Sequence, residues 1–559
     1  MDRIYPPIVR PELPPGVKLD ANVYVKMRDG IKIAVDVYRP EAEGRYPGIM
    51  STSPYIKDLQ LLSPLLTHSI EAGATQLFVS KGYVHVIVQV RGSGLSQGQY
   101  NWYDDVEQED GYELIEWMAQ QPWCNGNVGM LGDSYFGRSQ YLIAAKQPPH
   151  LKCIVPFDGG MDDYRDSRNQ GGLIRSGWLG MWGVDTMRQC LWPGPVEGKL
   201  PPTDLFIDRI SHPDDGPYYW ERSGWTKINK IKVPMLSLAM QLSATHSRGQ
   251  LWGYPKIESP KKLVVLPPAG AIANVFFIRS KPLNGLILKW FDYWLKGIDN
   301  GIMEGPPVAI CDETTREWRY ENEYPLARTQ WTKFYLRSNP AGKATEPPYG
   351  LISTEQPGNE APDQYVTPDC LSQLYAGKPV LGYATPPLDH DFRVWGPLST
   401  VLYASTTARD TAWFVKLGDI GPDGKMNLIT NGLLKASYRE LDATKSAPGQ
   451  PFITFQNPKP PEPNRIYEYQ IELMPIFHTF KKGHKIWIQI ASDDFEHHTR
   501  LHTIYTSEML PVPAINSIYH DAKHTSHILL PVIPDAPILK PVEPPLLDIR
   551  WPLTQGDSI

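Results

Sequence analysis

The spacing of hydrophobic and polar residues changes along the chain, and each change predicts a different kind of structure. Residues 83–94 form a continuous apolar run typical of a buried strand, and residues 104–123 form an amphipathic helix pattern with acidic residues in its first turn. The same alternation returns with strands over 233–240 and 261–270 and a helix over 284–299. Strands that alternate with helices predict a doubly wound α/β sheet.

The alternation of strands and helices is interrupted over one segment and gives way to strands alone in the C-terminal part of the chain. Residues 161–230 are rich in Trp, Gly and Met and lack it, so we interpret them as a cap inserted over the carboxyl edge of the sheet. After about residue 320, short alternating strands with frequent turns predict an all-β jelly-roll or sandwich. The predicted organisation is an N-terminal arm (1–22), an α/β core (23–160 and 231–315), a helical cap (161–230) and a jelly-roll domain with an extended C-terminal tail (320–559).

Length, composition and charge narrow the class of protein. A chain of 559 residues is too long for one hydrophobic core, and no apolar run approaches the length of a membrane span. A net charge of −6 does not favour nucleic acid or an anionic membrane as partner. The N-terminus shows no secretory signal, so we expect a cytoplasmic protein that acts on a small molecule; a homo-oligomer stays open.

The sequence does not predict a metal or a cofactor. Its five cysteines are scattered without CxxC spacing, which favours free thiols in a reducing compartment. His497, His498 and His502 resemble a ligand cluster, but they lie in the predicted jelly-roll, and we do not interpret them as a metal site.

The stretch "VGMLGDSYFGRSQY" (128–141) has the pattern of a nucleophile elbow. A short apolar strand meets a tight turn at Ser134, and a helix pattern follows. Gly132 precedes the serine by two positions, as small residues do in such turns. Phe136 stands where the G-x-S-x-G pattern has its second glycine, and Gly137 comes one residue later.

This six-residue form, G-x-S-Y-x-G, resembles the cocaine-esterase and X-prolyl dipeptidyl-peptidase group of α/β-hydrolases. The resemblance covers about residues 23–535 and implies an α/β-hydrolase core, a helical cap, a jelly-roll and serine-dependent cleavage of esters or amides. The blocks that carry it, in the family order, are "MRDGIKIAVDVYRP", "GYVHVIVQVRGSGLSQGQY", "IEWMAQQPWCNGNVGMLGDSYFG", "LILKWFDYWLKGIDNG", "VWGPLSTVLYASTTARDTAWFVKLGDIGPDG" and "FKKGHKIWIQIAS".

The resemblance also implies an oxyanion hole. In this family a tyrosine hydroxyl and the backbone N–H after the serine share that role. Tyr55, in "SPYIKD", matches the tyrosine, and Tyr135 supplies the N–H. Two such donors are worth several kcal/mol at a developing oxyanion, on the order of 2.7–4 each. The alternative is that Tyr55 is an ordinary packed aromatic residue of a loop.

The acid and base expected from the family are missing from their positions. Ser243 falls where the family has its Asp, and Gly270 or Ala271 falls where it has its His. No histidine occurs between His246 and His390. Because a serine hydroxyl is a poor nucleophile without a base, the sequence predicts a degenerate triad.

Two other residues are candidates for the missing roles. His246 follows the vacated acid position in the same loop; it either faces the pocket or is an ordinary loop histidine. Asp158 follows a predicted sheet strand at the edge where open α/β folds bind ligands. It is either a relocated acid or general base, or a turn residue.

Three functions therefore remain open. The main hypothesis is a non-hydrolytic enzyme that polarises a carbonyl-bearing, mostly apolar molecule and promotes cyclisation, elimination, isomerisation or C–C bond chemistry. The first alternative is a true serine esterase or amidase with relocated partners. The second alternative is a non-catalytic binding protein.

Overall fold

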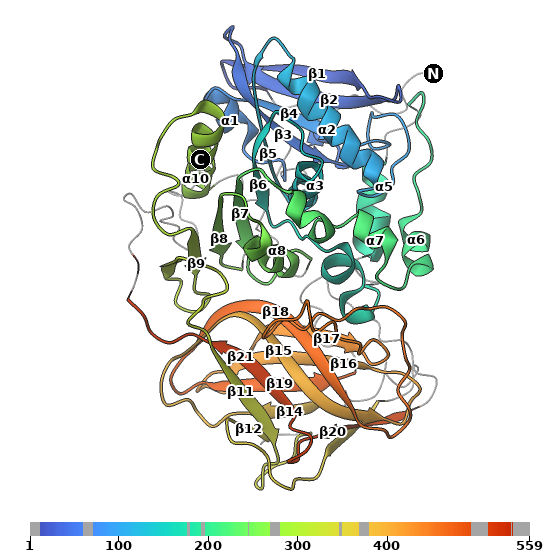
Figure 1. The fold of residues 1–559 in the computed structure, drawn as a ribbon, viewed down its shortest axis with the longest axis vertical. Coiled ribbons are helices and arrows are strands. Elements are labelled where there is room, and N and C mark those ends of the chain that lie inside the picture. Colours follow the sequence, from blue (N-terminus) through green and yellow to red (C-terminus); the bar gives the residue numbers. More distant parts are fainter. Residues whose placement is uncertain are drawn as a thin grey trace.

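The structure is a computed structural model, and it shows two strand-rich bodies stacked along the long axis (Figure 1). It describes residues 12–59, 71–175, 179–191, 196–243, 245–268, 280–345, 349–367, 380–492, 513–537 and 539.

The N-terminal body is built on a ten-stranded sheet with the order β1-β2-β4-β3-β5-β6-β7-β8-β9-β10. Its central strands from β4 to β9 are parallel, and antiparallel strands close both edges. This sheet confirms the α/β prediction. The strands are β1 (Val17–Lys26), β2 (Lys32–Pro40), β3 (Tyr46–Ser53), β4 (Val84–Gln89), β5 (Cys124–Asp133), β6 (Leu151–Phe157), β7 (Met235–Met240), β8 (Lys261–Leu266), β9 (Val308–Cys311) and β10 (Trp318–Glu321).

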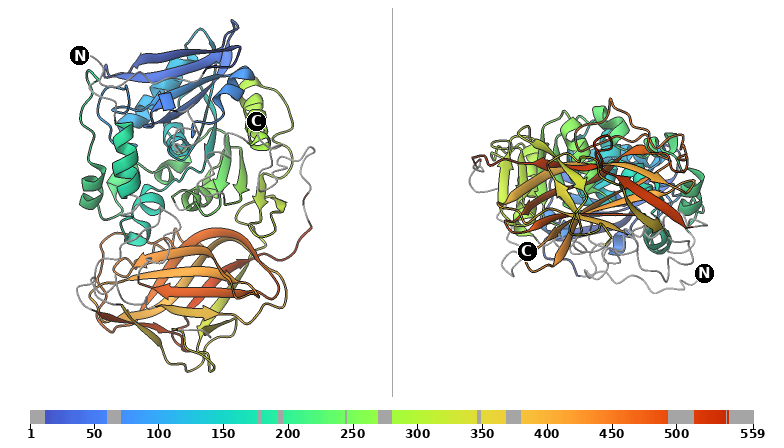
Figure 2. Two further views of the ribbon diagram at one scale, coloured as in Figure 1. Left: turned by 180° about the vertical axis from the view of Figure 1, so that it is seen from behind. Right: turned by 90° about the horizontal axis from the view of Figure 1, so that it is seen from below.

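Helices cover both faces of this sheet (Figures 1 and 2). Helix α2 packs Leu114, Ile115 and Met118 into one hydrophobic cluster, and α10 packs Trp290 and Phe291 into another. Burial on both faces explains why the parallel strands read as continuous apolar runs. The helices are η1 (Lys57–Leu59), α1 (Thr75–Ser80), α2 (Asp105–Ala119), α3 (Tyr135–Ala144), α8 (Ser247–Gly253), η7 (Tyr254–Lys256) and α10 (Lys281–Lys296).

The ends of two helices follow their sequence signals. Asp104 caps α2, because its side chain accepts a hydrogen bond from the Glu107 N–H. Ser280 caps α10 in the same way, and Gly297 ends α10 in the left-handed conformation with φ +70°.

Between β6 and β7 the chain forms a set of short helices, here called the insertion (158–234). Its carboxylate Asp163 is paired with three buried arginines: Arg138 at 2.6 Å, Arg209 at 2.9 Å and Arg168 at 3.5 Å. The insertion occupies the range in which a cap is predicted; that it covers a substrate stays a prediction. Its helices are η3 (Asp163–Arg168), η4 (Gln170–Gly172), η5 (Leu179–Thr186), α5 (Met187–Cys190), α6 (Leu205–Ser211), α7 (Pro217–Glu221) and η6 (Trp225–Lys230).

The C-terminal body is an eleven-stranded, almost entirely antiparallel sheet arrangement with the order β13-β20-β15-β18-β17-β16-β19-β14-β12-β11-β21. The strand-rich domain is thus confirmed, whereas its jelly-roll connectivity stays a prediction. The strands are β11 (Gln330–Arg337), β12 (Gly350–Ser353), β13 (Asp363–Thr367), β14 (Leu381–Ala384), β15 (Phe392–Thr406), β16 (Ala412–Ile420), β17 (Met426–Lys435), β18 (Tyr467–Phe480), β19 (Lys485–Ala491), β20 (Ala514–Tyr519) and β21 (His527–Val532).

The two bodies share their hydrophobic packing. Trp395 and Phe477 of the C-terminal sheet belong to a cluster of the N-terminal body, and Tyr164 and Tyr219 of the insertion belong to the main C-terminal cluster. The Trp395 indole N–H also donates to Asp312 at 3.0 Å. Shared clusters of this kind favour a fixed arrangement of the two bodies.

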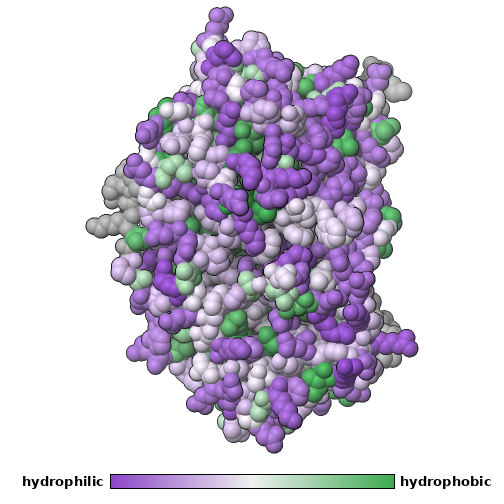
Figure 3. Space-filling view, in the orientation of Figure 1, coloured by the Kyte–Doolittle hydropathy of each residue, from purple (hydrophilic) through white to green (hydrophobic). Residues whose placement is uncertain are grey.

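The described residues bear on the predictions about membrane spans, surface and metal binding. None of the described helices is long and apolar enough to cross a membrane. The face in Figure 3 is mainly hydrophilic, with scattered hydrophobic residues. Across the described ranges, no group of three or more His, Cys, Asp or Glu is arranged to hold a metal. His497, His498, His502, Cys370 and most of the C-terminal tail lie outside the described residues.

The pairing of His478 in the C-terminal body predicts a pH-dependent stability. This buried ring lies 3.1 Å from Asp419 and 3.5 Å from Glu313; Thr314 contacts its Nδ1, and His484 contacts Asp419. Burial alone lowers the pKa of His478, but the hydrogen bonds to Asp419 and Glu313 outweigh it and raise the pKa to about 9.

Because the folded pKa exceeds the unfolded one, the stabilisation is complete below pH ~6.5 and is lost as pH rises through about 9. Its size is roughly 3 kcal/mol at most. Urea unfolding between pH 6 and 10 should show a steeper loss for the wild type than for His478→Gln. The exposed His390→Gln serves as control and should follow the wild type; equal slopes for all three proteins would contradict the assignment.

Candidate active site

The strand, tight turn and helix predicted around Ser134 are present as β5, the turn at Ser134 and α3, whereas the role of Ser134 as a nucleophile stays a prediction. Ser134 has φ +60° and ψ −112°, a backbone conformation that residues other than glycine rarely adopt. Its N–H donates to the carbonyl of Phe157 in β6 at 3.0 Å, and its own carbonyl accepts from the Arg138 N–H at 2.9 Å. Ser134 is half-buried while both chain neighbours are buried, so the turn presents this one side chain.

Two glycines make the turn sterically feasible. A Cβ on Gly132 would lie 2.2 Å from Cβ of Phe136, and Gly132 itself has φ +146°. A Cβ on Gly137 would lie 2.5 Å from the carbonyl oxygen of Phe157. Gly137 therefore allows α3 to approach β6 closely. Because Gly137 has this role, Phe136 can stand where the G-x-S-x-G pattern has its second glycine.

The structure brings His246 to the serine. Its Nε2 lies 3.3 Å from Ser134 Oγ. His246 precedes α8, directly after the loop that follows β7, and its backbone N–H donates to the Ser243 carbonyl at 3.2 Å. Of the two predicted alternatives for His246, facing the pocket or lying in the loop without a role there, this contact with Ser134 favours the first.

The other nitrogen of His246 meets a backbone donor. The Gly160 N–H donates to Nδ1 at 3.3 Å. In a neutral imidazole one nitrogen carries the proton, and the hydrogen bond of the other nitrogen decides which one. An Nδ1 that accepts from Gly160 places the ring proton on Nε2, so that His246 donates to Ser134 Oγ in this arrangement.

Asp158 lies on the same side of the sheet and is joined to the loop of His246. It follows β6 with φ +44°, and its Oδ2 accepts from the Ser243 hydroxyl at 2.5 Å. Its Oδ1 is buried and has no hydrogen-bond partner within the described part of the chain. Asp158 thus bonds to Ser243, the residue predicted to stand at the acid position, and Ser243 lies in the loop that carries His246.

Burial dominates the charge state of the carboxyl groups behind the serine. It raises the pKa of Asp158 to about 7, although the Ser243 hydroxyl and the Met240 amide favour the ionised form. Burial also raises the pKa of Asp133 well above its usual value, and the nearby Glu71 and Asp158 add to the shift. Uncharged carboxyl groups are therefore substantially populated near neutral pH.

Tyr55 lies against the elbow, and its role in an oxyanion hole stays a prediction. Its ring centroid is 6.1 Å from that of Tyr135 and 5.9 Å from that of Phe136. Trp182 of the insertion donates its indole N–H to the Tyr55 oxygen at 3.0 Å. Burial raises the pKa of Tyr55 well above 10, so the hydroxyl keeps its proton.

The side chain of Tyr135 is held away from the serine by a buried polar group. Its hydroxyl donates to Glu107 on α2 at 2.9 Å, and the Tyr103 hydroxyl donates to the Tyr135 carbonyl at 3.0 Å. Burial raises the pKa of Glu107 to about 8. These contacts fix the first turn of α3. The N–H groups of that turn have no partner within the helix and point out of its N-terminus.

Some contacts of this site were not predicted from the sequence. Gly160, Trp182 and the hydroxyl of Ser243 each bind a predicted residue, and each comes from a segment distant in sequence from its partner. The Gly-Gly pair at 159–160 was a local signal for a close backbone approach, but nothing in the sequence named its partner. Gly270 and Ala271, which are predicted to stand at the base position, lie outside the described residues.

Comparison with known proteins places this chain in a family. A model of the X-Pro dipeptidyl-peptidase (S15 family) matches residues 29–269, and a model of the X-Pro dipeptidyl-peptidase C-terminal non-catalytic domain matches residues 300–529. Cocaine esterase of Rhodococcus sp. (strain MB1 Bresler) is 28% identical over 92% of this chain and 98% of its own length.

Solved structures agree with this assignment at the level of the fold. A CocE/NonD family hydrolase from Staphylococcus aureus superposes with a TM-score of 0.81 at 24% identity, covering 92% of this chain and 93% of that chain. An α-amino acid ester hydrolase superposes with a TM-score of 0.71 at 20% identity, covering 95% and 100%. The protein is an α/β-hydrolase with a strand-rich C-terminal domain. It belongs to the family of S15 peptidases and cocaine-esterase-like hydrolases.

The buried carboxyl of Asp158 predicts a specific pH dependence. Its folded pKa lies above the unfolded value, so ionisation costs the folded state stability as pH rises from about 4 through about 7. Asp158→Asn removes this cost. The difference in Tm between variant and wild type should shift in favour of the variant between pH 5 and pH 9. A difference that stays constant over this range would show that Asp158 is not buried in the way described.

Proposed function

We propose that this protein is a serine hydrolase of carboxylic esters or amides, with Ser134 as nucleophile and His246 as base. The contact between Ser134 Oγ and His246 Nε2 at 3.3 Å, on a strained elbow of a hydrolase-family fold, is the observation that carries the proposal. His246 accepts the serine proton while Oγ attacks the carbonyl carbon, and it returns that proton to the leaving alcohol or amine. Water then releases the acid from the acyl-enzyme.

Tyr55 and the Tyr135 N–H form the oxyanion hole in this proposal. The Tyr55 oxygen accepts from Trp182, and burial raises the pKa of Tyr55 well above 10, so the hydroxyl carries the proton that a donor to a substrate oxygen needs. The Tyr135 N–H lies at the start of α3, where helix N-termini favour negative charge. Donors that are in place before the reaction act most strongly where water is excluded.

Asp158 takes the role of the acid by holding the loop of His246. By resemblance to the family, acid and base follow β7 and β8. In this chain the candidates Asp158 and His246 follow β6 and β7, one strand earlier. The hydrogen bond from Ser243 to Asp158 joins the two. Transfer of the serine proton to Nε2 requires the tautomer with its proton on Nδ1, in which the Gly160 N–H no longer donates to that atom.

An ester with an apolar group is the substrate class that the surroundings favour. One buried hydrophobic cluster next to the elbow contains aromatic and methionine side chains, namely Tyr55, Trp102, Tyr135, Trp182 and Met187. Aromatic and methionine side chains are typical of pockets for apolar ligands. The similarity to cocaine esterase is consistent with this class. A small-molecule substrate in the cytoplasm, without a cofactor, remains our proposal, and homo-oligomerisation stays open.

A second candidate is the non-hydrolytic reaction on a carbonyl compound predicted from the sequence. The Gly160 N–H on Nδ1 is the observation that favours it, since a ring with its proton on Nε2 cannot accept the serine proton. His246 and Tyr55 would then polarise the substrate together, and Ser134 would only position it. Family membership favours hydrolysis, which is why this candidate stands second.

Labelling with a fluorophosphonate probe and turnover of p-nitrophenyl esters distinguish the two candidates. Hydrolysis predicts stoichiometric labelling of Ser134 in the wild type and loss of both signals in Ser134→Ala. His246→Gln should lower ester turnover by about 10³-fold or more, as removal of a triad member does. Serine labelling that is absent, or that is unaffected by His246→Gln, would overturn the proposed dyad.

The ranking of Tyr55 and Ser134 provides an independent test. Under hydrolysis, Tyr55→Phe should lower kcat by about 10²-fold, on the scale of one lost oxyanion donor, and Ser134→Ala should cost more. Under the second candidate the order reverses, because no covalent step uses Ser134. The matched control is Tyr46→Phe in β3, which should leave kcat unchanged, because the Tyr46 hydroxyl donates to the Ala42 carbonyl in an exposed contact.

A further inference from the structure

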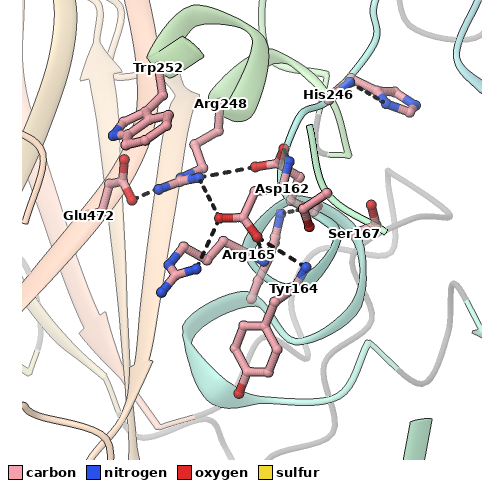
Figure 4. A network of polar contacts seen from close by, with 12 residues as sticks. Asp162, Tyr164, Arg165, Ser167, His246, Arg248, Trp252 and Glu472 are labelled. Carbon is pink, nitrogen blue, oxygen red and sulfur yellow. Dashed lines mark hydrogen bonds and ion pairs between the residues drawn. The ribbon is translucent and has the colours of Figure 1, made fainter. Parts of the chain in front are cut away.

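The helix that begins after His246 is tied to the C-terminal domain by one arginine. Arg248, two residues after His246, places Nε 2.9 Å from Glu472 of β18 and Nη1 3.3 Å from Asp166 of the insertion. It lies between the two bodies of the protein, as Figure 4 shows for Arg248, Glu472 and Asp162. Arg248 is 8% exposed, so these charges interact where water screens them little.

Asp166 lies between the two segments that hold the imidazole of His246. A Cβ on Gly160 would come within 2.9 Å of Asp166 Oδ2, and a Cβ on Gly249 in α8 would come within 1.8 Å. Gly160 donates to His246 Nδ1, and Gly249 is the third residue after His246. The Asp166 carboxylate therefore touches both the backbone donor of the ring and the helix that carries the ring.

Glu472 has a rigid support that α8 lacks. Strand β18 runs over fourteen residues and pairs with β15 along most of its length, whereas α8 has seven residues. Thr400 of β15 is the partner of the neighbouring Ile471, and Ser399 is the partner of Glu472 itself. A carboxylate fixed on such a strand can define where a short helix lies.

We propose that Glu472 is a positioning residue for His246: through Arg248 and Asp166, the C-terminal domain sets the place of the imidazole relative to Ser134. The proposal rests on the proposed function of the Ser134–His246 pair. It assigns a part in the reaction to a domain whose family model is described as non-catalytic. Neither Glu472 nor Arg248 touches substrate in this scheme.

Glu472→Gln tests the proposal with little change in volume. Misplacing a catalytic group by about 1 Å can cost up to ~10²-fold, so kcat for p-nitrophenyl butyrate should fall by about 10- to 100-fold with KM within about threefold. The matched control is Glu468→Gln, on the same strand; Glu468 is exposed and bonds to Tyr403 and Gln470. The control should keep the wild-type kcat, and equal effects of both variants would overturn the proposal.

A combined replacement separates position from stability. Arg248→Met with Glu472→Met replaces the ion pair by apolar side chains, which often preserves stability. Asp166→Asn is added, because Arg248→Met would otherwise leave the buried Asp166 carboxylate without its partner at 3.3 Å. We expect a Tm close to that of the wild type together with the low kcat of Glu472→Gln. Wild-type kcat in this folded variant would contradict a positioning role.

Histidine-selective ¹⁵N NMR provides a readout that does not depend on turnover. The His246 signals, assigned by their loss in His246→Gln, report its tautomer and its own pKa. Glu472→Gln should change them, and Glu468→Gln should not. If the wild type hydrolyses no ester, the proposed function fails while this measurement still decides the positioning role; unchanged His246 signals in Glu472→Gln would overturn it.

Discussion

The strained backbone of Ser134 is the constraint on which the rest of this site depends. A non-glycine residue in such a conformation costs on the order of 1–3 kcal/mol and persists only where its surroundings determine it. Here the Phe157 carbonyl binds the Ser134 N–H, and Gly137 allows α3 to approach β6 closely enough for that bond. Sheet, helix and turn therefore have to form together, and the serine side chain is presented as a consequence.

Buried charge is the second organising feature. Arg138, on the helix that follows the serine, pairs with Asp163 of the insertion, and Arg168 and Arg209 pair with the same carboxylate. Although burial alone would raise the pKa of Asp163, these three arginines hold it well below its usual value. Desolvated ions of this kind contribute less to net stability than to a single arrangement, because an unpaired partner would be costly.

The same logic extends to the C-terminal body. Arg165 pairs with Asp162 at 3.0 Å and Asp215 at 2.8 Å, and it donates to the Ile453 carbonyl of the strand-rich domain at 2.8 Å. Its guanidinium also lies 4.2 Å from the ring centroid of Phe452. The insertion thus carries a fixed set of charges between the two bodies, and the loop of His246 lies beside it. Changes in either body are expected to reach the site through these contacts.

The sequence alone determined the features that depend on neighbouring residues. Apolar periodicity indicated the α/β sheet and the strand-rich domain, and the spacing of Gly132, Ser134 and Gly137 indicated the elbow, because strand, turn and helix propensities act over a few residues. Motif resemblance placed Tyr55 beside it. The resemblance predicted that Ser243 stands at the acid position of the family, but the sequence left two alternatives for His246 and for Asp158.

Only the tertiary structure decided which of these residues meet. The contact of His246 with Ser134 spans 112 positions, and that of Ser243 with Asp158 spans 85. Gly160 contacts His246 through its backbone N–H, so no side chain in the sequence indicates this contact. Glu472 is one of many carboxylates on alternating strands, and nothing near it in the sequence distinguishes it. Such contacts arise from the order of parallel strands and from packing between domains, and neither is encoded in local residue patterns.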